Sequence, residues 1–199
     1  MNFDQSGGLT GPVIFIVVVI VLLVIVFGPS IWVSRVLDRY SVPADRYSGT
    51  GGDLARYLLD QRGLTRVAVE TTEHGDHYDP EAKAVRLTED KFGGRSLTAI
   101  TVAAHEVGHA IQDHEGYGPL RMRTKLVKGT QWVQKLGAGI LMVSPFLGIV
   151  TRVPALGLLT FAAGLLTLGT AAVVHAFTLP TEFDASFARA LPLLDEHRI

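Results

Sequence analysis

A long charge-free apolar run near the N-terminus constrains the fold of this chain more than any other feature. It extends from Thr10 to Ser34 and has the core VIFIVVVIVLLVIVF, so it exceeds the ~20 apolar residues that a helix needs to span a bilayer. A cleaved signal peptide is the alternative, but such peptides carry a basic region before the apolar run. Here the preceding tail has no Lys or Arg, and basic residues follow the run instead. We therefore predict a retained anchor over residues 12–33, with residues 1–11 as an outer tail.

Two further apolar runs follow late in the chain, at residues 132–150 and 153–179. The turn between them is very short, which is typical of a helical hairpin. A buried hairpin of a soluble protein is the alternative, but a chain of 199 residues is too small to wrap so much apolar surface in other protein. The composition agrees, because only 19% of the residues are charged, against about 25% in a soluble domain. The sequence thus predicts a membrane protein with three transmembrane helices.

Basic residues near the ends of the apolar runs predict the orientation. Eight Lys or Arg side chains flank the middle of the chain, whereas Arg152 alone lies at the opposite ends of the runs. Because Lys and Arg collect on the cytoplasmic side, we expect residues 34–131 to form a cytoplasmic region and the N-terminus to lie outside. The hairpin then returns residues 180–199 to the cytoplasmic side.

Charge and cysteine content exclude several kinds of site. With 18 Lys and Arg against 19 Asp and Glu, the net charge is -1, which gives no field for nucleic acid. Cysteine is absent, so the chain has neither disulfides nor thiolate chemistry, and a metal site has to use His and carboxylates.

The cytoplasmic region reads as a mixture of helices and two strands. Residues 48–62 resemble a Gly-rich lead into a short helix, with Leu54, Tyr57 and Leu58 on its apolar face. The segments VAVE (67–70) and AVRLT (84–88) predict a β-hairpin, with turn residues between them. Ser96 then caps a helix that we expect over residues 96–114. The predicted fold class is therefore mainly α with a small β-hairpin or sheet.

This last helix carries the most specific motif, His105-Glu-Val-Gly-His109. Four residues advance a helix by about 400°, so the two imidazoles lie on one face and can bind the same metal ion. Glu106 lies about 100° away, where it can reach a metal-bound water and act as its base. Two ordinary surface histidines are the alternative, but the small residues around the motif leave room for close packing, which favours a metal site. We expect a single Zn2+ ion there.

A tetrahedral catalytic zinc site needs a third protein ligand and one open position. His114 is on the wrong face of the helix, about 180° from His105. Three other histidines are weaker alternatives, two in the predicted hairpin turn and one near the inner end of the last apolar run: His74, His77 and His175. Glu182 is the better candidate, because it emerges on the same side of the membrane as the histidine pair.

At this point the residues resemble the YugP-like neutral zinc metallopeptidases of bacterial membranes. The matching motifs follow one another along most of the chain: Asp76–Pro80, Arg95–Ser96, Val102–Gln112, Gly116–Tyr117, Leu179–Ser186 and Arg189–Leu191. The resemblance implies a zincin-like α+β catalytic region, anchored in the bacterial inner membrane. It also implies that His105, His109 and Glu182 hold zinc and that Glu106 is the catalytic carboxylate. Asp184 and Ser186, which follow Glu182 closely, are candidates to orient the ligands. More distantly, the arrangement is similar to HtpX-like gluzincins, whose ligand Glu is followed four residues later by Asp. Ser186 stands at that position here, so the resemblance favours Asp184 for this role.

The functional hypothesis is a membrane-bound zinc endopeptidase with its site facing the cytoplasm. We expect a protein or peptide substrate to pair with an edge strand at Ala84–Thr88. Membrane lipid is a further expected partner, together with a second copy of the chain or another membrane protein. Two rival hypotheses are a non-catalytic scaffold or pseudoprotease with a structural zinc site, and a transport component. The second is weaker, because the apolar runs contain almost no ionisable residues.

Overall fold

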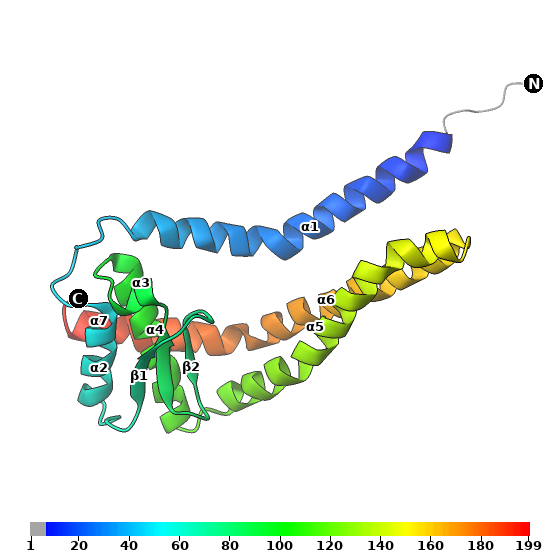
Figure 1. The fold of residues 1–199 in the computed structure, drawn as a ribbon. Helices are drawn as coiled ribbons and strands as arrows, with labels where there is room; N and C mark the ends of the chain where they lie inside the picture. The colour runs from blue at the N-terminus through cyan, green and yellow to red at the C-terminus, as the bar shows by residue number, and fades with distance from the viewer. Residues whose placement is uncertain (1–6) are drawn as a thin grey trace, which may run out of the picture.

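The computed structural model describes residues 7–199 and shows a small globular part from which three long helices extend. These helices are α1 (Gly7–Tyr40), α5 (Gly118–Val150) and α6 (Pro154–Phe183), and Figure 1 shows them all projecting to the same side. The prediction of a mainly helical chain with a small β part is confirmed. All three helices run past the predicted span limits, because polar residues can extend a helix beyond its apolar part. The helix α1 continues to residue 40, α5 begins at residue 118 and α6 continues to residue 183.

The described residues test the predicted spans only in part. Among them, Gly118–Val150 is the one helix that is long and apolar enough to cross a membrane, and Ala155–Gly164 is a shorter apolar stretch. Residues 1–6 of the predicted outer tail lie outside the described residues, as do many side chains of the 12–33 span and several of the 153–179 span. Three spans therefore remain a prediction.

The two legs of the hairpin, α5 and α6, pack closely along their length. Small residues permit this approach, because a Cβ on Gly137 would overlap the side chain of Thr167, and a Cβ on Gly164 would lie 2.5 Å from Leu141. Contacts between small residues are the usual way in which helices associate in a membrane.

The sheet differs from the predicted hairpin. Its strands are β1 (Ala68–Thr71), β2 (His77–Asp79) and β3 (Ala84–Leu87), in the order β1-β3-β2. The two predicted strands do pair, but in parallel, and β2 pairs antiparallel with β3 from the segment expected to be a turn. The physical reason is length, since a parallel connection needs about a dozen residues and the segment between β1 and β3 supplies them.

This topology overturns the predicted substrate edge. Because β3 lies between β1 and β2, the segment Ala84–Thr88 lies in the centre of the sheet. Its backbone already pairs with β1 on one side and with β2 on the other, so no edge is free for a substrate. The burial pattern agrees, since Ala84, Val85 and Leu87 are all buried. The free edges belong to β1 and β2.

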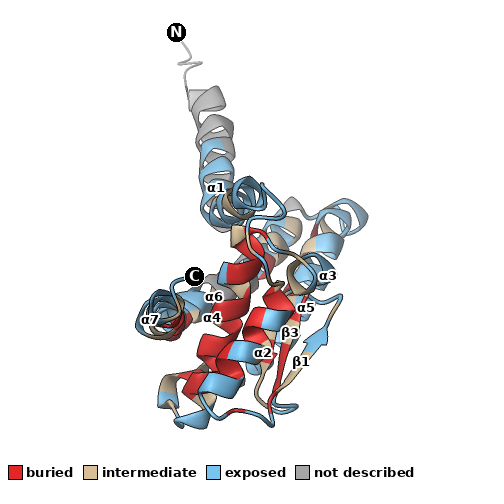
Figure 2. Ribbon diagram, turned by 90° about the vertical axis from the view of Figure 1, so that its left-hand side faces the viewer, coloured by how far each residue is buried: buried red, intermediate tan, exposed pale blue. Residues whose placement is uncertain are grey.

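The core lies between the sheet and the helices α2 (Gly51–Gln61) and α4 (Leu97–His114). Figure 2 shows the buried residues gathered in these two helices and in β3. Leu54 and Leu58 are buried as expected for the apolar face of α2, but Tyr57 is exposed and its place in the core is taken by Leu59. The phenol of Tyr57 instead contacts Nδ1 of His197 at 3.1 Å.

The C-terminal elements close the core from the other side. The end of α6 leads without interruption into the π-helix η1 (Asp184–Ala190) and then into α7 (Leu191–Glu196), while the short α3 (Glu89–Phe92) precedes α4. The π-helix packs against α4, and Ala185, Ala190 and Leu193 are buried there. Wider π turns are frequent at functional sites.

Candidate metal centre

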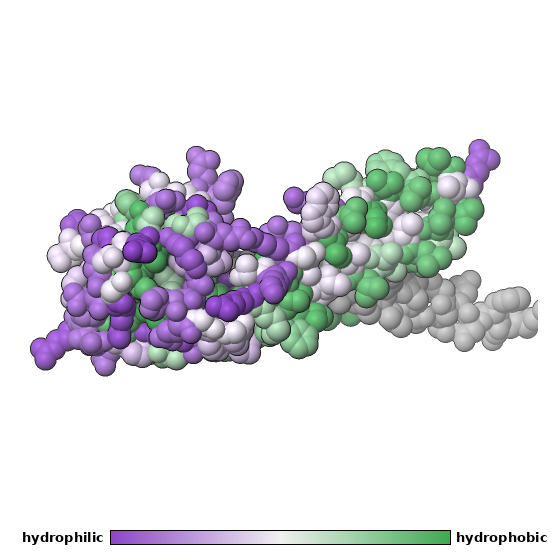
Figure 3. Space-filling model, turned by 90° about the horizontal axis from the view of Figure 1, so that it is seen from below, coloured by the Kyte–Doolittle hydropathy of each residue, from purple (hydrophilic) through white to green (hydrophobic). Residues whose placement is uncertain are grey.

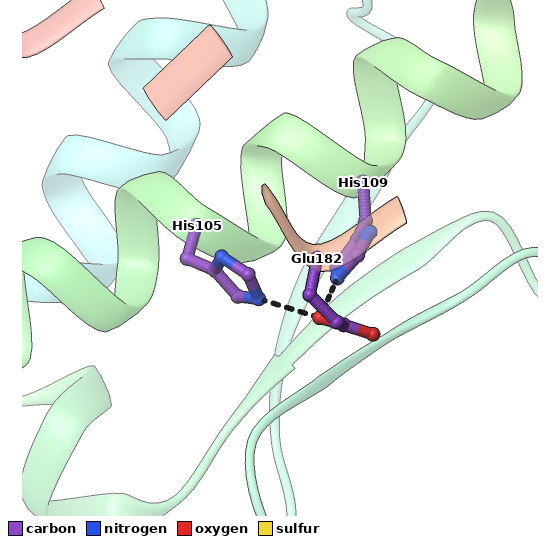
Figure 4. A group of neighbouring side chains, drawn as sticks. All are labelled: His105, His109 and Glu182. Carbon is purple, nitrogen blue, oxygen red and sulfur yellow. Dashed lines mark hydrogen bonds and ion pairs between the residues drawn. The ribbon is translucent and has the colours of Figure 1, made fainter. Parts of the chain in front are cut away.

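The helix α4 presents two imidazoles on one face. Ser96 caps its N-terminus by accepting a hydrogen bond from the backbone N–H of Ala99, which fixes where the helix begins. His105 and His109 are then one turn apart, with ring centroids 4.6 Å from each other. His109 is only 2% exposed, whereas His105 is half-buried. Figure 4 shows both rings pointing from successive turns towards the carboxylate of Glu182.

Glu182, near the end of α6, is the third member of the cluster. Its Oε2 lies 3.3 Å from Nε2 of His105 and 3.2 Å from Nε2 of His109. The donor atoms of the three residues all lie within 4.8 Å of one another. Donors at 2.0–2.1 Å from a tetrahedral zinc ion are separated by about 3.3–3.4 Å. The two nitrogen–oxygen separations therefore fit a shared zinc ion.

The hydrogen bonds of Gln112 fix the orientation of His109. The Gln112 amide donates from Nε2 to the carbonyl of Thr181 at 2.9 Å and to Oδ2 of Asp184 at 2.7 Å. Its Oε1 is therefore the atom that faces Nδ1 of His109, at 2.9 Å, so that Nδ1 carries the proton. In the neutral ring Nε2 then has a free lone pair, which faces a carboxylate oxygen of Glu182. Two such acceptors at this distance need a positive charge between them, which either a bound metal ion or the proton of an imidazolium supplies.

His105 is held in the same way by a different partner. Its Nδ1 lies 3.0 Å from Oγ of Ser186, which again leaves Nε2 directed at Glu182. Ligating histidines usually have the second ring nitrogen fixed by such a bond. Ser186 and Asp184, the two residues proposed to orient the ligands, thus lie beside the cluster, one directly against His105 and the other through Gln112.

Arginines complete the polar surroundings. Arg123 of α5 donates from Nε to Oε1 of Glu182 at 2.7 Å, so the two carboxylate oxygens have separate partners. Arg189 donates from Nε to Asp184 at 2.7 Å and from Nη1 to Glu115 at 2.6 Å. The five-residue step from Asp184 to Arg189 matches the wider turn of the π-helix in which both lie.

These contacts set the charge states of the cluster. Burial disfavours the charged form of Glu182, but hydrogen bonds from both imidazoles, together with the Arg123 guanidinium, hold the pKa of that carboxyl well below its usual range. Burial also lowers the pKa of His105, yet the bond to Glu182 and the nearby Glu106 raise it above its ordinary value. Glu182 is therefore an anion, as a metal ligand has to be.

Glu106 lies beside the cluster without belonging to it. Its side chain is 6% exposed, and burial raises the pKa of its carboxyl above the ordinary value, although His105, His109 and Arg123 oppose this. Glu106 is thus a buried carboxyl with a raised pKa next to the candidate metal ligands.

Gly108 explains how α4 and η1 come so close. A Cβ at this position would lie 2.5 Å from the carbonyl oxygen of Ala185. Because no larger residue fits, glycine lets the backbone of η1 approach the same turn of α4 that carries His109. This contact helps to place Glu182 opposite the two rings.

The other histidine candidates do not join the cluster. His74, His114 and His175 are exposed, and His77 is half-buried with its Nδ1 against the carbonyl of Gly75 at 2.8 Å. Sequence reasoning missed the roles of Gln112 and Arg123. Helical spacing could have indicated Gln112, three residues after His109, whereas nothing local to Arg123 shows its contact with Glu182.

A helix-borne pair of histidines and a carboxylate from a later helix is the donor set of zinc hydrolases that use a His2Glu site. The chain matches the family described as "putative neutral zinc metallopeptidase" over residues 15–199. It is also 36% identical, over 173 residues, to the "putative membrane protease YugP" of Bacillus subtilis (strain 168), an alignment covering 84% of this chain and 73% of the relative. No solved structure matches. The chain belongs to this metallopeptidase family.

Proposed function

We propose that the protein is a membrane-bound zinc endopeptidase in which His105, His109 and Glu182 hold one zinc ion. The observation that carries this proposal is the convergence of two Nε2 atoms on one oxygen of Glu182, at 3.3 and 3.2 Å, while other side chains hold each Nδ1. Family membership supports zinc and a peptidase activity.

Glu106 is the proton carrier in this proposal. Zinc bound at the cluster would acidify water and polarise the carbonyl of the peptide bond. Glu106 accepts the proton as the water attacks and returns it to the leaving amine. Its position beside the two histidines supports this role, and burial raises the pKa of its carboxyl, which favours uptake of the proton. Arg123 keeps Glu182 in place and ionised through its bond to Oε1.

The membrane arrangement is part of the same proposal. Helices at 12–33, 132–150 and 153–179 cross the bilayer, and the globular part faces the cytoplasm because most flanking basic residues lie on its side. Figure 3 shows a hydrophilic globular end and a largely hydrophobic helical pair with a hydrophilic tip. The antiparallel hairpin carries Glu182 back to the side on which α4 lies, which supports this topology.

A structural zinc site in a non-catalytic scaffold is the alternative. Such sites are closed, with four protein ligands. Within the part of the chain that the structure describes, the cluster has three members. The fourth coordination position is thus left for water or substrate, which favours catalysis.

Metal content and casein hydrolysis, measured on detergent-purified full-length variants, test this function. His105→Ala and Glu182→Ala should lose zinc and activity, whereas Glu106→Gln should keep zinc and lose activity. His114→Ala is the matched control, because this exposed histidine of the same helix lies outside the cluster. Undiminished hydrolysis by Glu106→Gln would reject the mechanism, and equal zinc content in Glu182→Ala would reject the ligand set.

A further inference from the structure

A groove of about 440 Å3 lies between the sheet and the first half of α5. One wall consists of β2 and the two residues after it, including Tyr78 and Glu81. The other wall is one face of α5, formed by Leu120, Arg123, Thr124, Val127, Lys128 and Gln131. In the described part of the chain β2 pairs only with β3, so its outer edge is free to pair with an extended peptide.

The groove adjoins the metal centre through one residue, Arg123. Arg123 lines it and also donates to Oε1 of Glu182 at 2.7 Å. A polypeptide in the groove would therefore pass Arg123, the direct partner of the third donor of the cluster.

The groove ends where α5 becomes apolar. Its α5 residues follow one helix face from Leu120 to Gln131, a rise of about 16 Å. The next residue, Trp132, is 73% exposed and is the first residue of the apolar half of α5. The amine of Lys135 lies near the indole ring of Trp132. Trp and Lys at such a boundary are typical of the membrane interface. Figure 3 shows the corresponding change from a hydrophilic to a hydrophobic surface between the globular end and the helical pair.

We propose that this groove binds the juxtamembrane segment of a membrane-anchored polypeptide, extended along β2 between the metal centre and the bilayer. The inference rests on the proposed function and names its substrate class. An extended chain advances about 3.3 Å per residue, so ~16 Å corresponds to about five residues. Cleavage falls about five residues from the point where the substrate enters the membrane.

One ion pair joins the two walls of the groove. Lys128 of α5 contacts Glu81, which follows β2. Both side chains are exposed, so the pair is weak and easily separated. An entering peptide displaces it without a large rearrangement of either wall.

Proteoliposomes that contain the full chain with zinc test the proposal. The probe is a randomised ten-residue cassette in three forms: joined to a transmembrane helix by five Gly/Ser residues, joined to the same helix by 25, and free in solution. We expect the five-residue form to be cleaved at least about tenfold faster than the 25-residue form, with the cuts clustered near the anchor. The long form controls for tethering alone.

The outcomes separate this inference from the function on which it rests. Equal rates for both tethered forms, or a faster rate for the free cassette, would overturn the groove assignment and leave the peptidase intact. No cleavage of any form would reject the peptidase proposal, and the groove assignment with it.

A groove variant gives an independent test. Val127→Trp should slow cleavage of the five-residue form at least about tenfold while zinc content stays unchanged, because the indole fills the groove. Met122→Trp, on an exposed position outside the groove, is the matched control. If Val127→Trp loses zinc, Thr124→Phe replaces it. Wild-type cleavage by a zinc-loaded groove variant would contradict the proposal.

Discussion

Replacing Gly108 by alanine should disrupt the metal centre although the side chain contacts no ligand. The new Cβ would lie 2.5 Å from the carbonyl oxygen of Ala185, whereas real Cβ atoms essentially never come closer than 3.0 Å to another heavy atom. The backbones of α4 and η1 therefore have to separate by at least about 0.5 Å. Metal–ligand distances tolerate only about 0.2 Å, and Glu182 lies three residues before Ala185 on the displaced element.

Two measurable effects follow from this separation. Zinc affinity should fall at least about tenfold, a loss typical of changes that disturb ligand placement. Alanine normally stabilises a helix by about 1 kcal/mol relative to glycine, but overpacking costs about 1–3 kcal/mol, so Gly108→Ala should be neutral to destabilising by about 2 kcal/mol. Competition with a chromophoric chelator and thermal unfolding in detergent measure the two quantities.

Gly129→Ala is the matched control, because its Cβ would meet nothing within 4 Å in α5. This variant should keep zinc affinity and be slightly more stable than the wild type. Wild-type affinity and raised stability in Gly108→Ala would refute the close-approach argument.

Three further predictions concern the surroundings of the cluster. Removing zinc with a chelator should lower the unfolding temperature, because zinc at a hundred times its Kd stabilises the folded chain by about 2.7 kcal/mol; identical melting curves would refute this. Gln112→Leu should weaken zinc binding about 10- to 100-fold, since Nδ1 of His109 loses its acceptor, and an unchanged chelator titration would contradict it. Asp184→Asn should flatten the acid dependence of stability. Burial raises the pKa of Asp184, but hydrogen bonds from Gln112 and Arg189 outweigh it and hold the pKa below its ordinary value, so its contribution is present above the unfolded pKa of about 3.9 and is lost as the pH falls through the folded pKa. Unfolding curves from about pH 5 to pH 2 would show no difference between variant and wild type if this reasoning were wrong.

Features with a local cause could be predicted from the sequence. Helical periodicity alone brings His105 and His109 onto one face, and Ser96 is a cap by its residue type and position. Glu182 required one non-local assumption, that the two apolar runs form a hairpin. A hairpin puts Glu182 on the same side as the histidine pair. The structure agrees, because Oε2 of Glu182 lies 3.2 Å from Nε2 of His109.

Features that depend on tertiary packing could not be predicted in this way. The pairing of β1 with β3 is parallel, but alternation of apolar residues is the same in parallel and antiparallel pairs, so the strand order was wrong. The contact of Arg123 with Glu182 joins two different helices. The π-helix at Asp184–Ala190 likewise lies where the chain packs against α4.

The two legs of the hairpin supply the third donor and its partner: Glu182 comes from α6, and Arg123, which donates to it, from α5. During synthesis, a ribosome that has released residues only as far as the first leg has already exposed both imidazoles and the buried acid. The third donor, Glu182, follows only after the second leg has been synthesised. With the proposed activity, the chain would thus become able to cleave neighbouring proteins only once its hairpin is complete.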